Sequence, residues 1–388
     1  MFYLGIDIGK NTHVASLVDD KKNVIFKAFS FSNSIDGAQS LILKLEAFKN
    51  ELEVGMEATG HYWLSLYSFL CEKNFTVRVI NPIQTDGWRS GIEIRKRKTD
   101  IIDSLLIADL LRYGDFVETS LSNEDYLSLR NLSRFRSYLI SSIGDLKRKT
   151  IALLDQVFPE YASSFSNIFG KTSKEILSNF STPSDFEDIN SDDLNTFLKS
   201  VTRKNYASKK IDELSKKASS FGINFCLDSF SLQIKMLIEQ ISFIQNQVSD
   251  VENEIEVLLE KLNSPITTIP GIGSVNAATI LGEIGDIKRF SNPSKLVAYA
   301  GLDASVSQSG EYESTYNHMS KRGSPYLRRA LFQSALRAEF CDPVFSAYYQ
   351  KKITEGKHHL VATNAVARKL CHTIFSVLTK NEPYQVQN

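Results

Sequence analysis

Four acidic residues on three separate segments are candidates for chemistry on phosphate esters. Asp7 and Glu57 follow apolar β-type runs, in FYLGIDIGKN and LEVGMEATGHYW, and Asp100 and Asp103 lie in KRKTDIIDSLLIADLL. The last pair is spaced i,i+3 on a helical pattern, so both side chains point to one face. Gathered carboxylates repel one another, and divalent cations are the usual remedy, with oxygen-liganded Mg²⁺ as the default. Two such ions can clamp the attacking and leaving oxygens of a phosphodiester.

Local basic clusters lie close to these acids in the sequence, although the formal net charge of the chain is zero. A run of like charge is usually a solvated face. A phosphate backbone, however, needs cations beside a metal site. We therefore expect nucleic-acid contacts from two groups: Arg95, Lys96, Arg97 and Lys98, and Arg130, Arg134, Arg136, Lys147, Arg148 and Lys149.

The composition is that of an ordinary globular protein with more than one domain. The chain has 388 residues, of which 42% are hydrophobic and 23% charged, and this length favours two or three domains. The four cysteines are scattered and none has metal-ligand spacing, which is typical of a reduced cytosolic protein without disulfides or zinc. The sequence shows no signal peptide and no membrane span, so we expect a cytoplasmic location.

Residues 1–118 are expected to form an α/β domain that positions the acids. Its order reads βββαβαβα, which indicates a mixed sheet covered by helices. The expected strands are 2–8, 13–19, 23–30, 52–57 and 75–80, and the expected helices are 36–49, 62–73 and 99–113. In this order Asp7 ends the first strand, Glu57 ends the fourth, and Asp100 and Asp103 begin the last helix. That layout resembles the RNase H-like fold as RuvC-type nucleases use it.

Residues 119–263 are expected to form a helical linker and dimerisation region. Residues 124–158 have a long helical pattern, and 160–205 read as short helices and loops. Within 232–262, apolar residues alternate at spacings of three and four, which predicts a coiled-coil seam. The seam can pair with the 124–158 helix inside one chain or with another subunit, and the sequence leaves both open.

Residues 264–388 are expected to form a mostly helical C-terminal domain. A Pro-Gly-Ile-Gly turn opens an Ala-rich helix and resembles the helix-hairpin-helix element, in which Gly271 and Gly273 would let backbone N–H groups approach a phosphate. A structural turn is an equally good interpretation. The segment SVSQSGEYES reads as a loop or hairpin, and the basic turn and helix after it supply further expected phosphate contacts: Lys321, Arg322, Arg328 and Arg329.

Taken together, these segments resemble the DEDD-class insertion-sequence transposases of the one-ten/eleven-eleven type, also called bridge-RNA-guided recombinases. The segments that carry the resemblance are GIDIGKNTH, GMEATGHYW, INP, RKTDIIDSLLIADLL, TIPGIG, KLVAYAGLD, QSG and SKRGSPYLRRAL. They follow in the family's order from residue 2 to about residue 378 and include both of its motif sets.

The resemblance implies a composite active site. Asp7, Glu57, Asp100 and Asp103 would be Mg²⁺ ligands, with Mn²⁺ as an alternative, and Ser309 of Gln308-Ser309-Gly310 would be the nucleophile. The implied partners are DNA, a structured noncoding guide RNA, and further copies of the chain, as a dimer and as a tetramer on DNA. The chain departs from the family pattern at Ala304, at Glu311 and in the stretch 317–319.

Three other functions remain as alternatives. The chain could be a RuvC-like Holliday-junction-type endonuclease that uses metal-activated water, with Ser309 only hydrogen-bonding. It could be a non-catalytic DNA-bridging protein, although such a protein has no reason to gather carboxylates. GIDIG also occurs in actin-like sugar kinases, but the second phosphate loop that they need is not evident downstream.

Overall fold

The structure is a computed structural model. It describes residues 1–58, 60–92, 99–114, 116, 123–187, 189, 191–201, 203–218, 222–304, 308–309, 312–313 and 318–386. The chain divides into two compact units, Met1–Leu121 and Ser122–Asn388. Within the described part, no helix is both long enough and apolar enough to span a membrane.

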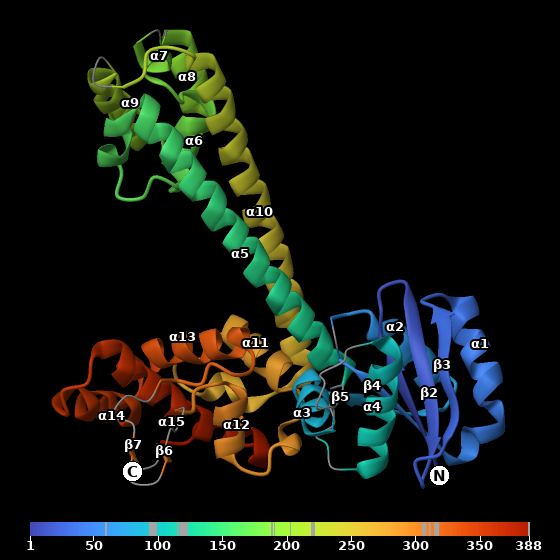
Figure 1. The fold of residues 1–388 in the computed structure, drawn as a ribbon. Coiled ribbons are helices and arrows are strands. Elements are labelled where there is room, and N and C mark those ends of the chain that lie inside the picture. Colours follow the sequence, from blue (N-terminus) through green and yellow to red (C-terminus); the bar gives the residue numbers. More distant parts are fainter. Residues whose placement is uncertain are drawn as a thin grey trace. The chain divides into compact units, whose positions relative to one another are not determined.

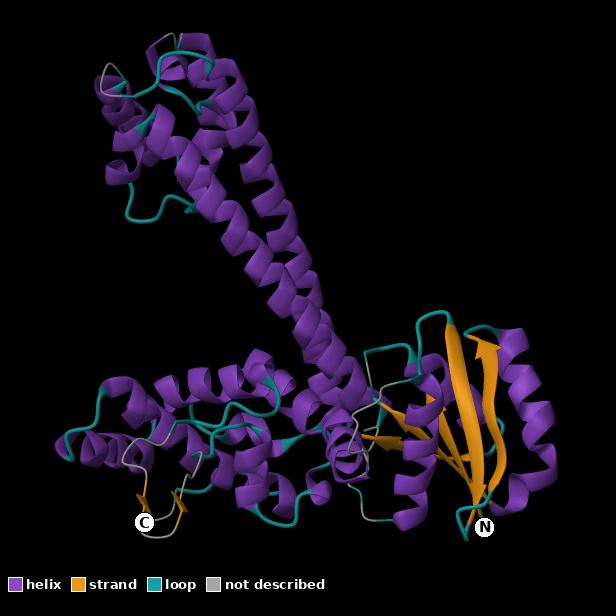
Figure 2. Cartoon of the chain, in the orientation of Figure 1, coloured by secondary structure: helices purple, strands orange, loops and turns teal. Residues whose placement is uncertain are grey.

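Unit 1 contains a five-stranded mixed sheet, as the sequence predicts (Figure 2). The order across the sheet is β3-β2-β1-β4-β5. β1 is antiparallel to β2 and β2 to β3, whereas β1, β4 and β5 run parallel to one another. The strands are β1 (Phe2–Asp7), β2 (Thr12–Asp19), β3 (Val24–Ser32), β4 (Leu52–Glu57) and β5 (Thr76–Ile80).

The helices of unit 1 match the expected ones with one addition. They are α1 (Ile35–Leu45) with the 3₁₀ turn η1 (Glu46–Glu51), α2 (Trp63–Glu72), α3 (Pro82–Ile92) and α4 (Asp100–Tyr113). The sequence reading placed no helix between the fifth strand and the last helix, so α3 was missed. The signal for it was present: Asn81-Pro82 is a typical helix start, with a capping residue type before a proline in the first turn.

Helix α4 lies directly against β1 because Gly5 leaves no side chain between them. A Cβ atom added at Gly5 would be 2.0 Å from the backbone oxygen of Ser104 and 2.4 Å from the backbone nitrogen of Ala108. The Ser104 hydroxyl also shares a 2.8 Å hydrogen bond with Ser16, the residue of β2 that pairs with Gly5. The position of α4 on the sheet is therefore set by backbone contact.

Unit 2 is built on two long antiparallel helices, α5 (Glu124–Val157) and α10 (Leu227–Leu262), which pack side by side (Figure 1). A cluster of short helices closes one end of the pair. It contains η2 (Pro159–Ser164), α6 (Lys171–Asn179), α7 (Pro183–Glu187), α8 (Ser191–Ser200) and α9 (Lys204–Lys217). This agrees with the short helices and loops expected over 160–205.

The apolar seam of α10 is covered by α5 of the same chain. Ile241 and Val248 of α10 share a hydrophobic cluster with Leu139 and Ile143 of α5. Ile234 and Ile255 of the seam are also fully buried. Of the two arrangements that the sequence left open, the pairing within one chain is the one that the structure contains.

The other end of the long pair carries the C-terminal helices. They are α11 (Ser274–Ile284), α12 (Pro293–Tyr299), α13 (Pro325–Cys341), α14 (Pro343–Thr354) and α15 (His359–Lys380), with short 3₁₀ turns η3 (Pro265–Thr268) and η4 (Ile287–Arg289). One hydrophobic cluster joins α11 to α15 and includes Leu129 of α5 and Ile255 of α10. The remainder of the chain outside the sheet is thus mostly helical, as expected.

The contact between β1 and α4 gives a test of the fold. Gly5→Ala should lower the free energy of unfolding by about 1–3 kcal/mol, because the new methyl group meets backbone atoms that cannot rotate away. Urea unfolding followed by circular dichroism measures this. Gly87→Ala in α3 is the matched control, since an added Cβ there meets nothing within 4 Å, and it should be neutral or stabilising. Equal stability of the two variants would contradict the close approach.

Candidate functional site

Asp7 and Glu57 lie at the same edge of the sheet. Asp7 ends β1 and Glu57 ends β4, and these two strands are parallel neighbours with Ile6 opposite Met56. The carboxyl ends of parallel strands meet at one edge, which is where ligands usually bind in such sheets. The chain order therefore brings together two acids that are 50 residues apart in sequence.

The beginning of α4 lies toward this same edge. At the far end of β1, Lys22 of the β2–β3 turn bonds Asp109 in the last turns of α4. In its middle, α4 touches Gly5. Asp100 lines a surface hollow with Val14, which is the partner of Asp7 in β2. Helix α4 thus runs opposite to β1, and its first turn lies at the end where Asp7 lies.

Helix α3 supplies side chains that bond to two of the four acids. The Thr85 hydroxyl donates a 2.8 Å hydrogen bond to Oε2 of Glu57, and Thr85 is buried. Arg89 forms an ion pair with Asp103, with 2.8 Å between Nη2 and Oδ1, and both side chains are largely buried. A buried pair of this kind is costly to break by removal of one partner. Sequence analysis missed both Thr85 and Arg89 because it missed the helix that carries them.

The four acids fit a hard cation by chemistry, since every donor is a carboxylate oxygen. Their present positions are not a coordination sphere: among the described residues, no three His, Cys, Asp or Glu side chains are grouped closely enough to hold a metal ion. Asp103 forms an ion pair with Arg89, and Asp100 is exposed at the start of α4. The assignment of the four acids as metal ligands stays a prediction.

Ser309 lies in a short hairpin of unit 2. β6 (Gln308–Ser309) pairs with β7 (Tyr312–Glu313) in antiparallel register, as the loop-or-hairpin expectation allowed. Below the hairpin, Ala304 bridges to Met319, and the Ser320 hydroxyl bonds Asp303. These contacts bring the two ends of the segment together. The side chain of Ser309 lies outside the described part of the chain, so its role as nucleophile stays a prediction.

Several of the predicted nucleic-acid contacts are engaged within unit 2. Arg134 forms a bidentate pair with the buried Glu283, at 2.6 and 3.0 Å, and Arg130 lies 3.8 Å from the same carboxylate. The hydrogen bond to Glu283 raises the pKa of Arg134. Arg136 pairs with Glu252 of α10 at 2.6 Å. These arginines join α5 to α11 and α10, so part of their charge serves packing.

The remaining predicted contacts differ in their surroundings. Arg148 pairs with Asp145, and Lys147 lies 5.2 Å from the ring centroid of Phe169. Arg328 donates to the backbone oxygen of Ala300 at 3.2 Å. Five of the predicted basic residues are solvent-exposed, namely Arg148, Lys149, Lys321, Arg322 and Arg329. The block of Arg95, Lys96, Arg97 and Lys98 lies outside the described residues.

The two glycines of the PGIG turn have different surroundings. Gly271 has φ +90°, and a Cβ there would be 2.5 Å from the backbone oxygen of Ser334 in α13. Gly271 therefore serves packing against α13. Gly273 precedes α11 as its N-cap, and an added Cβ would meet nothing within 4 Å. Only Gly273 leaves open space in front of the helix N-terminus.

Comparison with known proteins gives the family. A DEDD transposase model of the IS110 type matches residues 4–159, and a model described as the transposase IS116/IS110/IS902 family matches residues 263–350. The chain belongs to this transposase family. The two matches contain the acids and the serine hairpin respectively. The protein is thus an enzyme of DNA transposition, and its family implies DNA as a partner.

Relatives of this transposase match it along nearly its whole length. The pilin gene-inverting protein of Moraxella bovis is 25% identical over 386 residues, covering 98% of this chain and 97% of the relative. The 44.8 kDa protein of insertion element IS116 of Streptomyces clavuligerus is 24% identical, covering 97% and 94%. The mini-circle putative transposase for IS117 of Streptomyces coelicolor is 22% identical, covering 99% and 95%.

A buried carboxylate of the transposase that sequence analysis did not select links α4 to the sheet. Asp109 accepts from Lys22 at 2.8 Å and from Arg112 at 2.8 and 3.1 Å. Burial acts to raise the pKa of Asp109, but these hydrogen bonds outweigh it and hold the pKa below its ordinary value of 3.8. A carboxylate with a lowered pKa stabilises the fold above its unfolded-state pKa.

Asp109→Asn should therefore destabilise unit 1 by about 1.5–3 kcal/mol at neutral pH, the usual worth of hydrogen bonds to a charged group. The difference between the wild type and the variant should shrink as the pH falls below about 4, because the wild-type carboxylate then becomes protonated. Urea unfolding at a series of pH values measures both. A difference that persists at the lowest pH would show that the charge is not the cause.

The PGIG turn gives a second test. Gly271→Ala should lower the melting temperature for two reasons. Alanine is strained at the positive φ of this position, and its Cβ would collide with the backbone of α13. Backbone strain of this kind costs about 1–3 kcal/mol. Gly273→Ala should fold as the wild type does. Thermal unfolding of the two variants side by side decides this. If Gly273→Ala proves the more destabilised, the assignment of Gly271 as the packing glycine is wrong.

Proposed function

We propose that this transposase is an RNA-guided recombinase that cleaves and exchanges DNA strands by Mg²⁺-dependent chemistry. Unit 1 is the RNase H-like, RuvC-like nuclease domain, and Asp7, Glu57, Asp100 and Asp103 are its metal ligands. Ser309 in unit 2 is the nucleophile of a composite site. The observation that carries the proposal is that two parallel strand ends and the start of α4 place all four acids at one end of unit 1.

The chain's own residues prepare the acids for a cation. Thr85 fixes the orientation of Glu57, and Arg89 compensates the charge of Asp103. Arg89 is paired with Oδ1 of Asp103, so its guanidinium would have to move aside or share the carboxylate for Asp103 to hold a cation. When bound, Mg²⁺ or Mn²⁺ supplies Lewis-acid stabilisation of the scissile phosphate oxygens.

Ser309 conserves the energy of the broken bond. Its Oγ bonds the phosphorus while the bond from phosphorus to the leaving DNA oxygen breaks, and the hydroxyl proton passes to a basic group or to water. A serine hydroxyl is a weak nucleophile without such help. The phosphoserine ester is later attacked by a DNA hydroxyl, which restores the phosphodiester and frees the serine. Gene inversion, in the name of the Moraxella relative, also requires that cut strands be rejoined.

Further copies of the chain and a guide RNA complete the proposal. Strand exchange between two duplexes needs more than one active site, so we infer a dimer and, on DNA, a tetramer. Apolar side chains on the face of α10 opposite to α5 support this, because they remain exposed: Leu232, Met236, Phe243 and Val257. The basic residues that face solvent supply contacts for the RNA and DNA backbones, and binding should weaken with salt.

The test is a recombination assay with RNA transcribed from the noncoding DNA beside the element. Glu57→Gln and Asp7→Asn should reduce cleavage to below about one hundredth of the wild-type rate. Glu53→Gln is the matched control, since Glu53 lies on the same face of β4 at its opposite end and is paired with Arg78. It should keep its activity. Full activity of Glu57→Gln would refute the metal site.

The nucleophile is tested in the same assay. Ser309→Ala should abolish both the covalent protein–DNA adduct on denaturing gels and strand exchange. Ser305→Ala and Ser307→Ala should retain them. If Ser309→Ala still cleaves DNA, metal-activated water is the nucleophile and the protein is a RuvC-like endonuclease at this step. If the protein recombines DNA without the RNA, only the RNA-guidance part of the proposal is wrong.

A further inference from the structure

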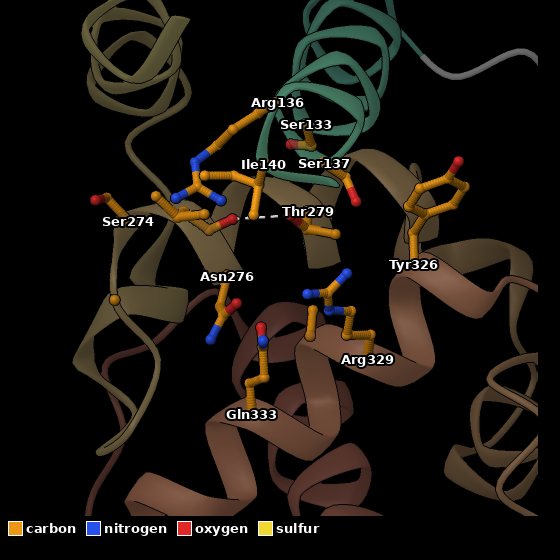
Figure 3. A pocket seen from close by; sticks show the side chains of 13 residues that line it. Ser133, Arg136, Ser137, Ile140, Ser274, Asn276, Thr279, Tyr326, Arg329 and Gln333 are labelled. Atoms are coloured by element: carbon orange, nitrogen blue, oxygen red, sulfur yellow. Dashed lines mark hydrogen bonds between the residues drawn. The ribbon is translucent and has the colours of Figure 1, made fainter. Parts of the chain in front are cut away.

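Unit 2 contains a hollow of about 460 Å³ between α5, the N-terminus of α11 and α13 (Figure 3). Polar side chains from all three helices border it: Ser133 and Arg136 from α5, Asn276 from α11, and Arg329 and Gln333 from α13. No carboxylate is among the described residues that line it. The hollow belongs to one compact unit, so its shape does not depend on how the two units are placed.

The charge of the hollow suits an anion. Within the described part of the chain, Arg329 has no ion-pair or hydrogen-bond partner, and its guanidinium points toward the middle of the hollow (Figure 3). Helix α11 begins beside it at Gly273, which provides no side-chain cap for the first N–H groups. Uncapped N–H groups and the positive end of the helix dipole both attract phosphate. Arg136 adds a second guanidinium, shared with Glu252.

Unsatisfied polar groups also border the hollow. The Ser133 hydroxyl is buried, with the residue only 6% exposed, and has no hydrogen-bond partner among the described atoms. Buried polar groups without partners are rare in folded proteins and call for an explanation such as a missing ligand. The side-chain amides of Asn276, which is half-buried, and of Gln333, which is exposed, make no hydrogen bond within the described residues, so both can accept a ligand from solvent. Each amide carries both donors and acceptors, the combination that reads base edges.

The size of the hollow decides between a phosphate and a larger group. Pockets for small organic ligands usually measure about 300–1,000 Å³, and this hollow lies within that range. A phosphate group alone would leave most of it empty. A nucleotide has a group for each part of the lining. Its phosphate fits Arg329 and the α11 N-terminus, and its base edge fits the two amides.

We propose that this hollow binds one unpaired nucleotide of a nucleic-acid strand, with its phosphate at Arg329 and the α11 N-terminus and its base edge at Asn276 and Gln333. A base inside a duplex cannot reach such a pocket, so the nucleotide comes from a single-stranded segment or is rotated out of the stack. The inference rests on the proposed function, because it makes the occupant part of the DNA substrate or the guide RNA. It adds to the four acids and Ser309 a further set of residues, which recognises an unpaired base.

The experiment measures binding of the full-length protein to short fluorescein-labelled probes by anisotropy. The probes are single-stranded homopolymers of each DNA base, the corresponding RNA strands, and a blunt DNA duplex. Arg329→Gln should weaken single-strand binding roughly tenfold or more, the usual effect of losing a charge-assisted contact. It should also lower the slope of log Kd against log salt by about one. Arg337→Gln is the matched control, since Arg337 is an exposed arginine of α13 that does not line the hollow.

Gln333→Leu tests the base-reading part. It should reduce the differences in affinity among the four homopolymers and leave duplex binding unchanged. Loss confined to the DNA strands, or to the RNA strands, identifies the source of the nucleotide. Equal effects of Arg329→Gln and Arg337→Gln would overturn the pocket, and so would a Gln333→Leu variant that weakens duplex and single strands alike.

The two proposals fail in different ways. If the protein does not recombine DNA, yet Arg329→Gln loses single-strand binding and Arg337→Gln does not, the pocket stands and the recombinase mechanism falls. If the wild type recombines DNA and the two arginine variants bind equally, the pocket alone is wrong.

Discussion

The direct contact of helix α4 with strand β1 is the constraint on which the candidate site depends. Gly5 lets the backbone at Ser104 and Ala108 come closer than any side chain would permit. Lys22 and Arg112 then hold the far end of α4 through Asp109. With its middle and its last turns held, the first turn of α4 has to lie beside the end of β1. The closeness of Asp100 and Asp103 to the strand that ends at Asp7 follows from this geometry.

Charge compensation follows from the same arrangement. Toward the edge where β1 and β4 end, Arg89 compensates the charge of Asp103, and the Thr85 hydroxyl donates a hydrogen bond to Glu57. Both come from α3, which follows β5 at the edge where β4 ends. The same helix therefore supplies both the charge and the hydrogen bond.

In unit 2, Glu283 is a buried carboxylate whose charge is compensated by an arginine. Its carboxylate receives Arg134 of α5, and the nearby Gly282 brings the α11 backbone close to Arg130. A buried carboxylate needs such a partner, because an unpaired charge in the interior is expensive. The packing of α5 against α11 also forms one side of the hollow that Arg329 lines. Some of the arginines that the sequence suggests as nucleic-acid contacts are therefore paired with carboxylates inside unit 2, and others remain at the surface.

What the sequence determined by itself was local. Short β-type runs predicted the five strands. Apolar residues at alternating spacings of three and four predicted that 232–262 is a helix with one covered face. Motif order also identified the transposase family, which the family matches confirmed. The strands and the α10 helix depend on neighbours within a few residues, and periodicity reports them directly. The family depends on the order of motifs along the whole chain.

Only the tertiary structure decided which charges are compensated and which remain available. Arg134 and Glu283 are 149 residues apart, and Arg136 and Glu252 are 116 apart, so no local pattern links them. It also decided that the α10 seam is covered by α5, that Gly271 serves packing while Gly273 faces open space, and that Arg329 points into a hollow. Each depends on which distant backbones come into contact, and that is set by packing of whole elements.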